Sequence, residues 1–438
     1  MTAVPAKDLS SKDPSPKNPS SKDPSSKEKG SGRSGPREQV VAAVGLLDRP
    51  LTSYYLVLGC SMMLLALGLT MVLSASSVKQ LQETGSAYTL FQKQAMWMVL
   101  GLPGMWLASR MPVKAIRSLA YPLLLLSIVA LVLVLVPGLG RTAGGATRWI
   151  SLGPMQIQPS EPAKLGLVLW GADLLARKER LGQLTEWRPL LVPLLPGAGL
   201  LVLLVMLGND LGTTLVLLTI FLALLWVVGA PARLFVGIAG LVCLLVSILI
   251  VVEPYRMQRL TGFLDPSGNQ LTSNYQGRQG LFAVASGGWF GTGLGEGRAK
   301  WDYLPHAETD FIFAIVGEEF GLVGTLVVLG LFGLLAYAGL RIARRVKDPF
   351  TRLAAAGATA WLVVQAIVNI GAVIGVLPIT GIPLPLVSYG GSALIPTLMV
   401  LGVLLAFAKR EPGARQALAA RGPGPVSRAL SWLGLARR

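Results

Sequence analysis

Ten apolar segments between residues 53 and 408 constrain this chain more than any other feature. Several approach the ~20 residues that a helix needs to cross a bilayer. Because a segment in lipid must satisfy its own backbone polar groups, spans of this length are helical. The sequence therefore predicts an all-α polytopic membrane protein with ten transmembrane helices. We expect them near residues 53–76, 94–109, 118–137, 162–176, 189–207, 211–229, 233–252, 311–338, 353–376 and 391–408.

The charge balance agrees with a membrane protein. The chain has 39 Lys and Arg residues against 22 Asp and Glu residues, a surplus that nucleic-acid-binding proteins also show. Here most of the basic residues fall on one side if both termini are cytoplasmic, which is the positive-inside pattern. The sequence therefore predicts two cytoplasmic termini and no nucleic-acid partner.

Three regions follow from composition. Residues 1–48 repeat Ser-Lys-Asp-Pro without an apolar face, which is typical of a disordered tail. Residues 49–410 hold all the apolar segments and form the membrane domain, and residues 411–438 form a basic cytoplasmic tail. The largest extracytoplasmic loop is expected between the seventh and eighth helices, over residues 253–310. Loops of that size in compact bundles are usually functional.

Residues that hold cofactors are scarce. Cys60 and Cys243 lie inside apolar runs, and His306 is the single histidine, so neither a disulfide framework nor a histidine-cluster metal centre is indicated. The sequence contains no Walker loop, dinucleotide fingerprint or zinc motif. No cofactor is evident, while a divalent cation stays open.

The stretch 301–324 carries acidic residues at the edge of a membrane span. Asp310 stands at its mouth, and Glu318 and Glu319 lie inside it. Because carboxylates are costly to desolvate in a membrane, they normally face a cavity or a partner. Two interpretations are open for Asp310: with Thr309 it supplies a cap for the helix N-terminus, or it takes part in a functional site.

Further polar residues are expected near the same outer face: Arg148, Gln158, Glu161, Lys164 and Asp210. They can be mutual ion pairs. They can also form a groove in which cations hold an anionic head group while a carboxylate transfers a proton. The nearby stretch 377–394 has three prolines and a Gly-Gly pair, which predicts either irregular backbone lining a cavity or a stiff turn.

Three motifs, in this order, resemble the signatures of the SEDS family (shape, elongation, division and sporulation). They read RWISLGPMQIQPSEPAK at 148–164, TDFIFAIVGEEFGLVG at 309–324 and GIPLPLVSYGGSALI at 381–395. The resemblance covers about residues 50–410. It implies a ten-span peptidoglycan glycosyltransferase that polymerises lipid II at the outer face of the cytoplasmic membrane.

The resemblance also implies partners and a cellular role. A class B penicillin-binding protein would act as the transpeptidase partner. The wording of residues 275–295 and 378–391 is closer to the division branch of the family than to the elongation branch. We therefore expect work at the division septum with other divisome proteins, and an elongation-type polymerase is the nearest alternative.

Site residues are implied residue by residue. The family's catalytic aspartate falls on Asp310, the expected general base. Its outer-loop basic residues fall on Arg148 and Lys164, beside Glu161. Its proline and Ser-Tyr-Gly-Gly motif gives the remaining expected substrate-binding residues: Pro383, Pro385, Ser388, Tyr389, Gly390 and Gly391.

The chain departs from the family pattern at His306, Glu308 and Ala393. The family often has histidine directly before Thr-Asp, so a role for His306 is not implied. Glu318 and Glu319 lie deeper along the helix than Asp310, and we expect them to be structural.

Two functions of another class compete with the transferase. A lipid flippase would use intramembrane polar residues as a translocation path, namely Asp173, Glu318, Gln365 and Asn369. A scaffold would only recruit the synthase.

Overall fold

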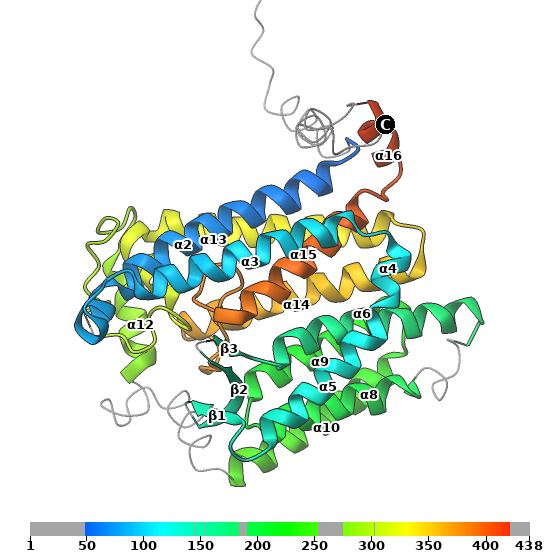
Figure 1. The fold of residues 1–438 in the computed structure, drawn as a ribbon, viewed down its shortest axis with the longest axis horizontal. Coiled ribbons are helices and arrows are strands. Elements are labelled where there is room, and N and C mark those ends of the chain that lie inside the picture. Colours follow the sequence, from blue (N-terminus) through cyan, green and yellow to red (C-terminus); the bar gives the residue numbers. More distant parts are fainter. Residues whose placement is uncertain are drawn as a thin grey trace, which may run out of the picture. The chain divides into compact units, whose positions relative to one another are not determined.

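The computed structural model describes residues 49–143, 145–153, 155–183, 191–252, 275–301 and 303–420, and this part of the chain is mostly helical (Figure 1). The predicted tail 1–48, most of the predicted tail 411–438 and the first part of the predicted outer loop lie outside the described residues.

Each of the ten predicted apolar segments contains a helix, the third as a helix pair. The helices are α2 (Thr52–Thr84), α3 (Thr89–Arg110), α4 (Val113–Ser118), α5 (Ala120–Leu135), α6 (Ser160–Arg180), α8 (Leu194–Leu207), α9 (Leu211–Val228), α10 (Ala232–Val252), α12 (Tyr275–Ser286), α13 (Ile312–Arg345), α14 (Pro349–Val373), the short 3-10 helix η1 (Gly391–Ala393), α15 (Leu394–Ala408) and α16 (Ala414–Ala420).

Six helical segments within the described ranges are long and apolar enough to cross a membrane. They are α2, α4 with α5, α9, α13, α14, and η1 with α15. Helix α8 is apolar but shorter. The chain is therefore a polytopic membrane protein by length and composition, and the number of ten spans stays a prediction.

The described part of the chain is mostly helical, as predicted, but a small sheet that the sequence did not predict lies between α5 and α6. Three antiparallel strands occur there in the order β1 (Gly140–Ala143), β2 (Ala146–Leu152) and β3 (Met155–Ile157). Gly145 and Gly153 have positive φ values of 78° and 63° at the two turns, a conformation that glycine adopts without steric cost. Their position allows both tight turns. We call the end of the helices beside this sheet the sheet end.

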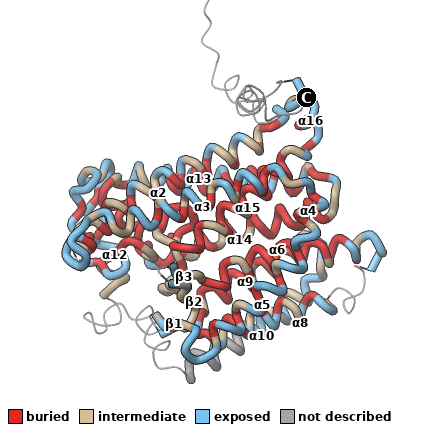
Figure 2. The backbone as a smooth tube through the Cα atoms, in the orientation of Figure 1, coloured by how far each residue is buried: buried red, intermediate tan, exposed pale blue. Residues whose placement is uncertain are grey.

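Helices α14 and α15 form the interior of the bundle (Figure 2). In the apolar window of α15, 89% of the residues are buried, against 28% in that of α4 and α5. Helix α15 packs on α3, and α14 packs on α13, α9 and α6. Gly402 lets α15 approach α3 closely, since a Cβ there would lie 2.3 Å from the carbonyl oxygen of Met105.

Helix α13 is interrupted at Gly321, whose φ of 66° and ψ of −161° are not helical. The loop after α12 packs against this interruption. The amide of Thr292 donates to the carbonyl of Glu318 at 2.9 Å, and the amide of Leu322 donates to the carbonyl of Gly288 at 2.9 Å. The glycine-rich stretch after residue 275, in which no transmembrane helix is predicted, is therefore attached to α13.

Candidate functional site

Asp310 lies just before α13, and its side chain is partly exposed. Asn369 Nδ2 donates a 2.8 Å hydrogen bond to the main-chain carbonyl of Asp310 and another of 2.8 Å to that of Ile382. At Gly381, where φ is +72°, an added Cβ would lie 3.5 Å from Asp310 Oδ2. The carboxylate therefore lies beside the backbone of residues 381–382. The N-cap position of α13 is Phe311, so neither predicted capping residue occupies it.

Glu308 ties the same segment to two other elements. Its carboxylate pairs with Lys79 of α2 at 3.4 Å, and its carbonyl accepts a 2.9 Å hydrogen bond from the amide of Tyr389. Burial raises the pKa of the Tyr389 hydroxyl, and the negative charge of Glu308 raises it further. His306 is exposed, has a φ of 57°, and accepts main-chain bonds from the turn that leads to α13.

Glu161 and Lys164 form a second group inside the bundle. Their side chains pair at 2.8 Å and are 3% and 1% exposed. Lys164 Nζ also donates to Gln365 Oε1 at 3.0 Å and lies 5.0 Å from the ring centroid of Trp361. Gln365 Nε2 donates in turn to the carbonyl of Pro383 at 3.1 Å. Both ions are enclosed, and Gln365 connects them to the backbone of Pro383.

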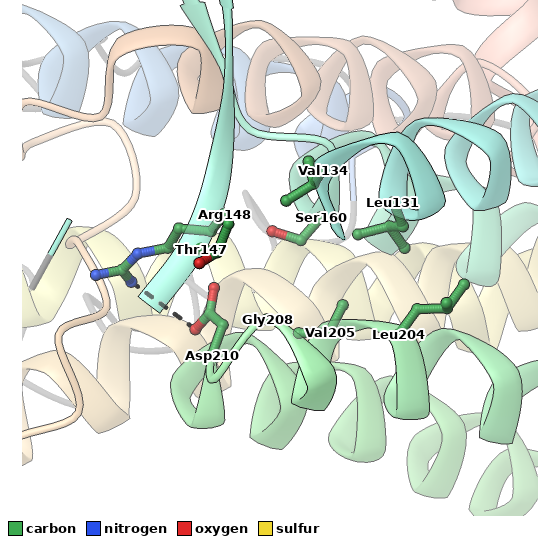
Figure 3. A pocket seen from close by; sticks show the side chains of 9 residues that line it. All are labelled: Leu131, Val134, Thr147, Arg148, Ser160, Leu204, Val205, Gly208 and Asp210. Carbon is green, nitrogen blue, oxygen red and sulfur yellow. Dashed lines mark ion pairs between the residues drawn. The ribbon is translucent and has the colours of Figure 1, made fainter. Parts of the chain in front are cut away.

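Arg148 and Asp210 form a third group, between β2 and the start of α9 (Figure 3). Their charged groups are 3.8 Å apart. Asp210 also caps α9, accepting a 3.1 Å hydrogen bond from the amide of Thr213, and Gln158 Nε2 donates to its Oδ2 at 3.4 Å. The adjoining cavity measures about 10 Å³, room for about one water molecule. It does not hold a sugar in this conformation.

The segment between α14 and η1, residues 374–390, contains no helix or strand. The backbone there is irregular, and both sequence interpretations, the lining of a cavity and a stiff turn, stay predictions. Pro383 and Pro385 flank Leu384, whose amide donates to Ser388 Oγ at 2.9 Å, and the carbonyl of Ser388 accepts from Gln94 of α3 at 3.3 Å. The segment also lies close to Gly68 of α2.

The last residues of the predicted motif continue this segment into η1. Gly391, with a φ of 53°, directly follows Tyr389 and Gly390 and opens η1. Ser392 in η1 accepts a 3.1 Å hydrogen bond from the amide of Gln158, which joins the segment to the group around Asp210.

The predicted residues therefore lie in three connected groups at the sheet end, around Asp310, Lys164 and Arg148. Sequence reasoning missed two contributors. Lys79 is one lysine near the end of a span and carries no distinguishing signal. Asn369 was considered only for a translocation path, because a lone amide in an apolar helix does not reveal which backbone it binds. No cluster of three metal-binding side chains occurs among the described residues.

The model of the cell cycle protein family that includes FtsW, RodA and SpoVE matches residues 54–412. The chain belongs to this family. The match covers nearly all of α2, every helix from α3 to α15 and all three motifs, so the resemblance to SEDS proteins is confirmed.

Curated relatives within the FtsW/RodA/SpoVE family agree. A Mycobacterium tuberculosis protein named "Probable peptidoglycan glycosyltransferase FtsW" is 45% identical over 401 residues, which cover 91% of this chain and 75% of the relative. "Stage V sporulation protein E" of Bacillus subtilis is 41% identical over 280 residues, covering 63% of this chain and 75% of the relative.

Solved structures show the same family fold. A chain from "Structural coordination of polymerization and crosslinking by a peptidoglycan synthase complex" is 33% identical with a TM-score of 0.67, covering 81% of this chain and 97% of that one. The rod shape determining protein RodA of Thermus thermophilus is 31% identical with a TM-score of 0.59 and the same coverage.

Proposed function

We propose that this chain is a peptidoglycan glycosyltransferase that polymerises lipid II into glycan strands at the outer face of the cytoplasmic membrane, with Asp310 as general base. Membership of the FtsW/RodA/SpoVE family and the 45% identity to a glycosyltransferase relative support the reaction class. The observation that supports the residue is its placement: a partly exposed carboxylate whose main chain is anchored by Asn369.

The chemistry needs one base. The acceptor's sugar hydroxyl gives its proton to the Asp310 carboxylate as its oxygen attacks the anomeric carbon of the donor. The bond from that carbon to the lipid pyrophosphate breaks, and the pyrophosphate leaves with the electron pair. A positioned base typically contributes about 10²–10⁴-fold.

The leaving group mainly needs positive charge. Arg148 and Lys79 are partly exposed cations at the sheet end, with exposed side-chain fractions of 25% and 34%. Arg148 therefore keeps its predicted substrate-binding role in this proposal, and a divalent cation would supply the same charge. Lys164 and Glu161 are buried, so in this proposal they influence the substrate indirectly, by holding Gln365, which in turn holds the backbone of Pro383.

The membrane arrangement is proposed with ten spans and both termini in the cytoplasm. The domains are a cytoplasmic tail over residues 1–48, a membrane domain over 49–410 and a basic tail over 411–438, with the largest loop, 253–310, outside. A class B penicillin-binding protein and other divisome proteins are the proposed partners. The related chain solved within a peptidoglycan synthase complex supports the first of these.

Asp310→Asn tests the base. Purified protein carrying this change should fold normally but polymerise lipid II at least about 100-fold more slowly, because the amide cannot accept the proton. Glu296→Gln is the matched control, an exposed carboxylate of the loop after α12, and should keep the wild-type rate. A near wild-type rate for Asp310→Asn would remove Asp310 from the mechanism.

The same variants separate the transferase from the flippase. The residues of the alternative translocation path already have partners: Asp173, for example, pairs with Arg117 and with Arg177 while fully buried. If Asp310→Asn stops polymerisation and leaves lipid movement across vesicles intact, the transferase is supported. Loss of lipid movement alone would support the flippase.

Depletion distinguishes the two branches of the family. A division polymerase should leave filaments or chains without septa when the protein is depleted. Loss of rod shape with septa intact would assign the chain to the elongation branch.

A further inference from the structure

We propose that Asn369 is a positioning residue that fixes Asp310 against the proline-rich segment 381–385. The inference deepens the proposed function and rests on Asp310 being the base. Asn369 lies on α14, 59 residues after Asp310 in sequence, and its side chain is 2% exposed. It acts through the main chain of Asp310 rather than by touching substrate.

The geometry of the amide is specific. Nδ2 donates to two carbonyl oxygens, those of Asp310 and Ile382, each at 2.8 Å. The other end of the amide, Oδ1, is buried and makes no hydrogen bond. Rotating the amide by half a turn would place Oδ1 against two carbonyl oxygens, which repel it. The two acceptors therefore determine the orientation and use both protons of the nitrogen.

The two bonds tie two segments to α14, in addition to the main-chain bond from Tyr389 to Glu308 that links the same segments directly. One bond holds Asp310, and the other holds the backbone that lies beside the Asp310 carboxylate at Gly381. One turn earlier on α14, Gln365 holds the carbonyl of Pro383. Helix α14 thus fixes the base and the backbone facing it from a single rigid surface.

Loss of this contact changes placement rather than chemistry. The carboxylate stays present, but the segment 308–310 can move relative to residues 381–385. A misplacement of about 1 Å in a reacting group can cost about 10²-fold in rate. Since Asn369 is enclosed, its removal should lower kcat while the KM for lipid II changes little.

The test compares full-length chains purified into lipid bilayer discs, assayed on lipid II with the transpeptidase partner present throughout. Asn369→Ala removes both donors, and Asn369→Asp keeps the shape but puts carboxylate oxygens against two carbonyls. Thr359→Val is the control: Thr359 is also buried on α14, but its hydroxyl donates only to Ala355 within the helix, at 2.7 Å. Thermal unfolding is recorded for each protein.

We expect kcat to fall about 10- to 100-fold in Asn369→Ala and further in Asn369→Asp, with KM within about threefold of wild type. Thr359→Val should keep both kcat and KM within about twofold of wild type, even if its melting temperature falls as far as that of Asn369→Ala. An unchanged kcat in Asn369→Ala, or a raised KM with kcat retained, would overturn the inference.

Asp310→Asn, assayed in parallel, separates this inference from the proposed function. If Asp310→Asn is inactive and Asn369→Ala is fully active, only the positioning role fails. If Asp310→Asn is fully active, the base assignment fails. A slow Asn369→Ala beside an active Asp310→Asn would show that Asn369 acts on the 381–385 segment alone, which also overturns the inference.

Discussion

Two acidic pairs lie within twelve residues of each other around the start of α13, and they differ in how far their carboxylates are enclosed. The carbonyls of both pairs accept hydrogen bonds, those of Glu308 and Asp310 from Tyr389 and Asn369, and those of Glu318 and Glu319 from Thr292 and Gly293. Asp310 is partly exposed, whereas the side chains of Glu318 and Glu319 are almost fully buried.

The side-chain partners of Glu318 and Glu319 come from the loop after α12 and from α2. Glu318 Oε1 accepts from the amides of Arg298 at 2.7 Å and Ala299 at 3.2 Å. Glu319 Oε1 pairs with Lys300 at 3.2 Å and accepts from Ser74 of α2 at 2.5 Å. Both carboxylates therefore attach the loop to α13, as the structural interpretation of this pair expects.

This difference in burial and in partners suggests different roles for the two pairs of acidic residues. Glu318 accepts from backbone amides and Glu319 pairs with a buried lysine, so both carboxylates stabilise a loop. In the proposed function, the partly exposed Asp310, whose main chain is anchored by Asn369, accepts a proton instead. Changes at the deeper pair should affect stability first, and changes at Asp310 should affect rate first.

Glu319→Leu should have the largest effect on stability. It leaves the Lys300 ammonium, 4% exposed, without its counter-ion. Breaking a buried pair in this way costs about 3–5 kcal/mol. The free energy of unfolding in detergent, from a denaturant titration, measures the loss.

The double variant Glu319→Leu with Lys300→Met removes both charges and should recover much of that loss, because the remaining cost was the unpaired ion. If the double variant is no more stable than Glu319→Leu, the pair is not what holds the loop to α13.

Gly321→Ala should have the next largest effect. The φ and ψ values of Gly321, 66° and −161°, are accessible essentially to glycine alone, and strain of this kind costs about 1–3 kcal/mol. An added Cβ would also lie 2.4 Å from the amide nitrogen of Gly291. We expect the loop to detach, seen as faster hydrogen exchange at residues 288–293. Gly330→Ala, where nothing lies within 4 Å of the added Cβ, is the control and should leave exchange unchanged.

The interruption at Gly321 also marks where sequence reasoning stops. Apolar length placed the helices of this chain, since spans of about 20 residues admit little other regular structure. The same signal treated residues 311–338 as one span, because a glycine inside an apolar run carries no mark of its φ value. The strands at 140–157 were missed for a similar reason: they are short, and glycine-rich loops are compatible with many structures.

The site was predictable as a set of residues but not as a set of contacts. The motifs supplied Asp310, Arg148 and Lys164, while their distances depend on backbone far away in sequence. Lys164 illustrates this: a lysine near the mouth of a span is expected at the surface, yet it is 1% exposed. Its pairing with Glu161, three residues earlier, could be predicted from the sequence, whereas its hydrogen bond to Gln365 could not.

Glu318→Gln should have a smaller effect on stability than the two preceding changes. The amide can still accept from the amide of Arg298 but loses the charge that strengthens both bonds. We expect a loss of about 1–2 kcal/mol, since hydrogen bonds to charged groups contribute about 1.5–3 kcal/mol and part of this survives. Polymerisation by the folded fraction should be unchanged, whereas a loss of rate at full stability would bring Glu318 into the mechanism.

The smallest expected effect is a change in the pKa of Tyr389, which lies beside Glu308. Burial, and then the charge of Glu308, raise its pKa above the ordinary 10.0. The folded protein therefore keeps this proton longer than the unfolded chain. The resulting stability is fully present below pH 10.0 and is lost as the pH rises through the folded value. At neutral pH the hydroxyl is a donor, not an anion.

Glu308→Gln should lower the pKa of Tyr389 without restoring its ordinary value, because burial is the larger cause and remains. Tyrosinate absorbance during an alkaline titration, taken as the difference between each protein and its Tyr389→Phe counterpart, isolates this group. A Tyr389 that ionises at its ordinary value in the wild type would mean that water reaches the hydroxyl. The site around Glu308 and Asp310 would then be more hydrated than the structure indicates, and its difference from the buried site of Glu318 and Glu319 would be larger. An unchanged pKa of Tyr389 in Glu308→Gln would mean that the positive charge of Lys79, 3.4 Å from the Glu308 carboxylate, already cancels the effect of the Glu308 charge on Tyr389.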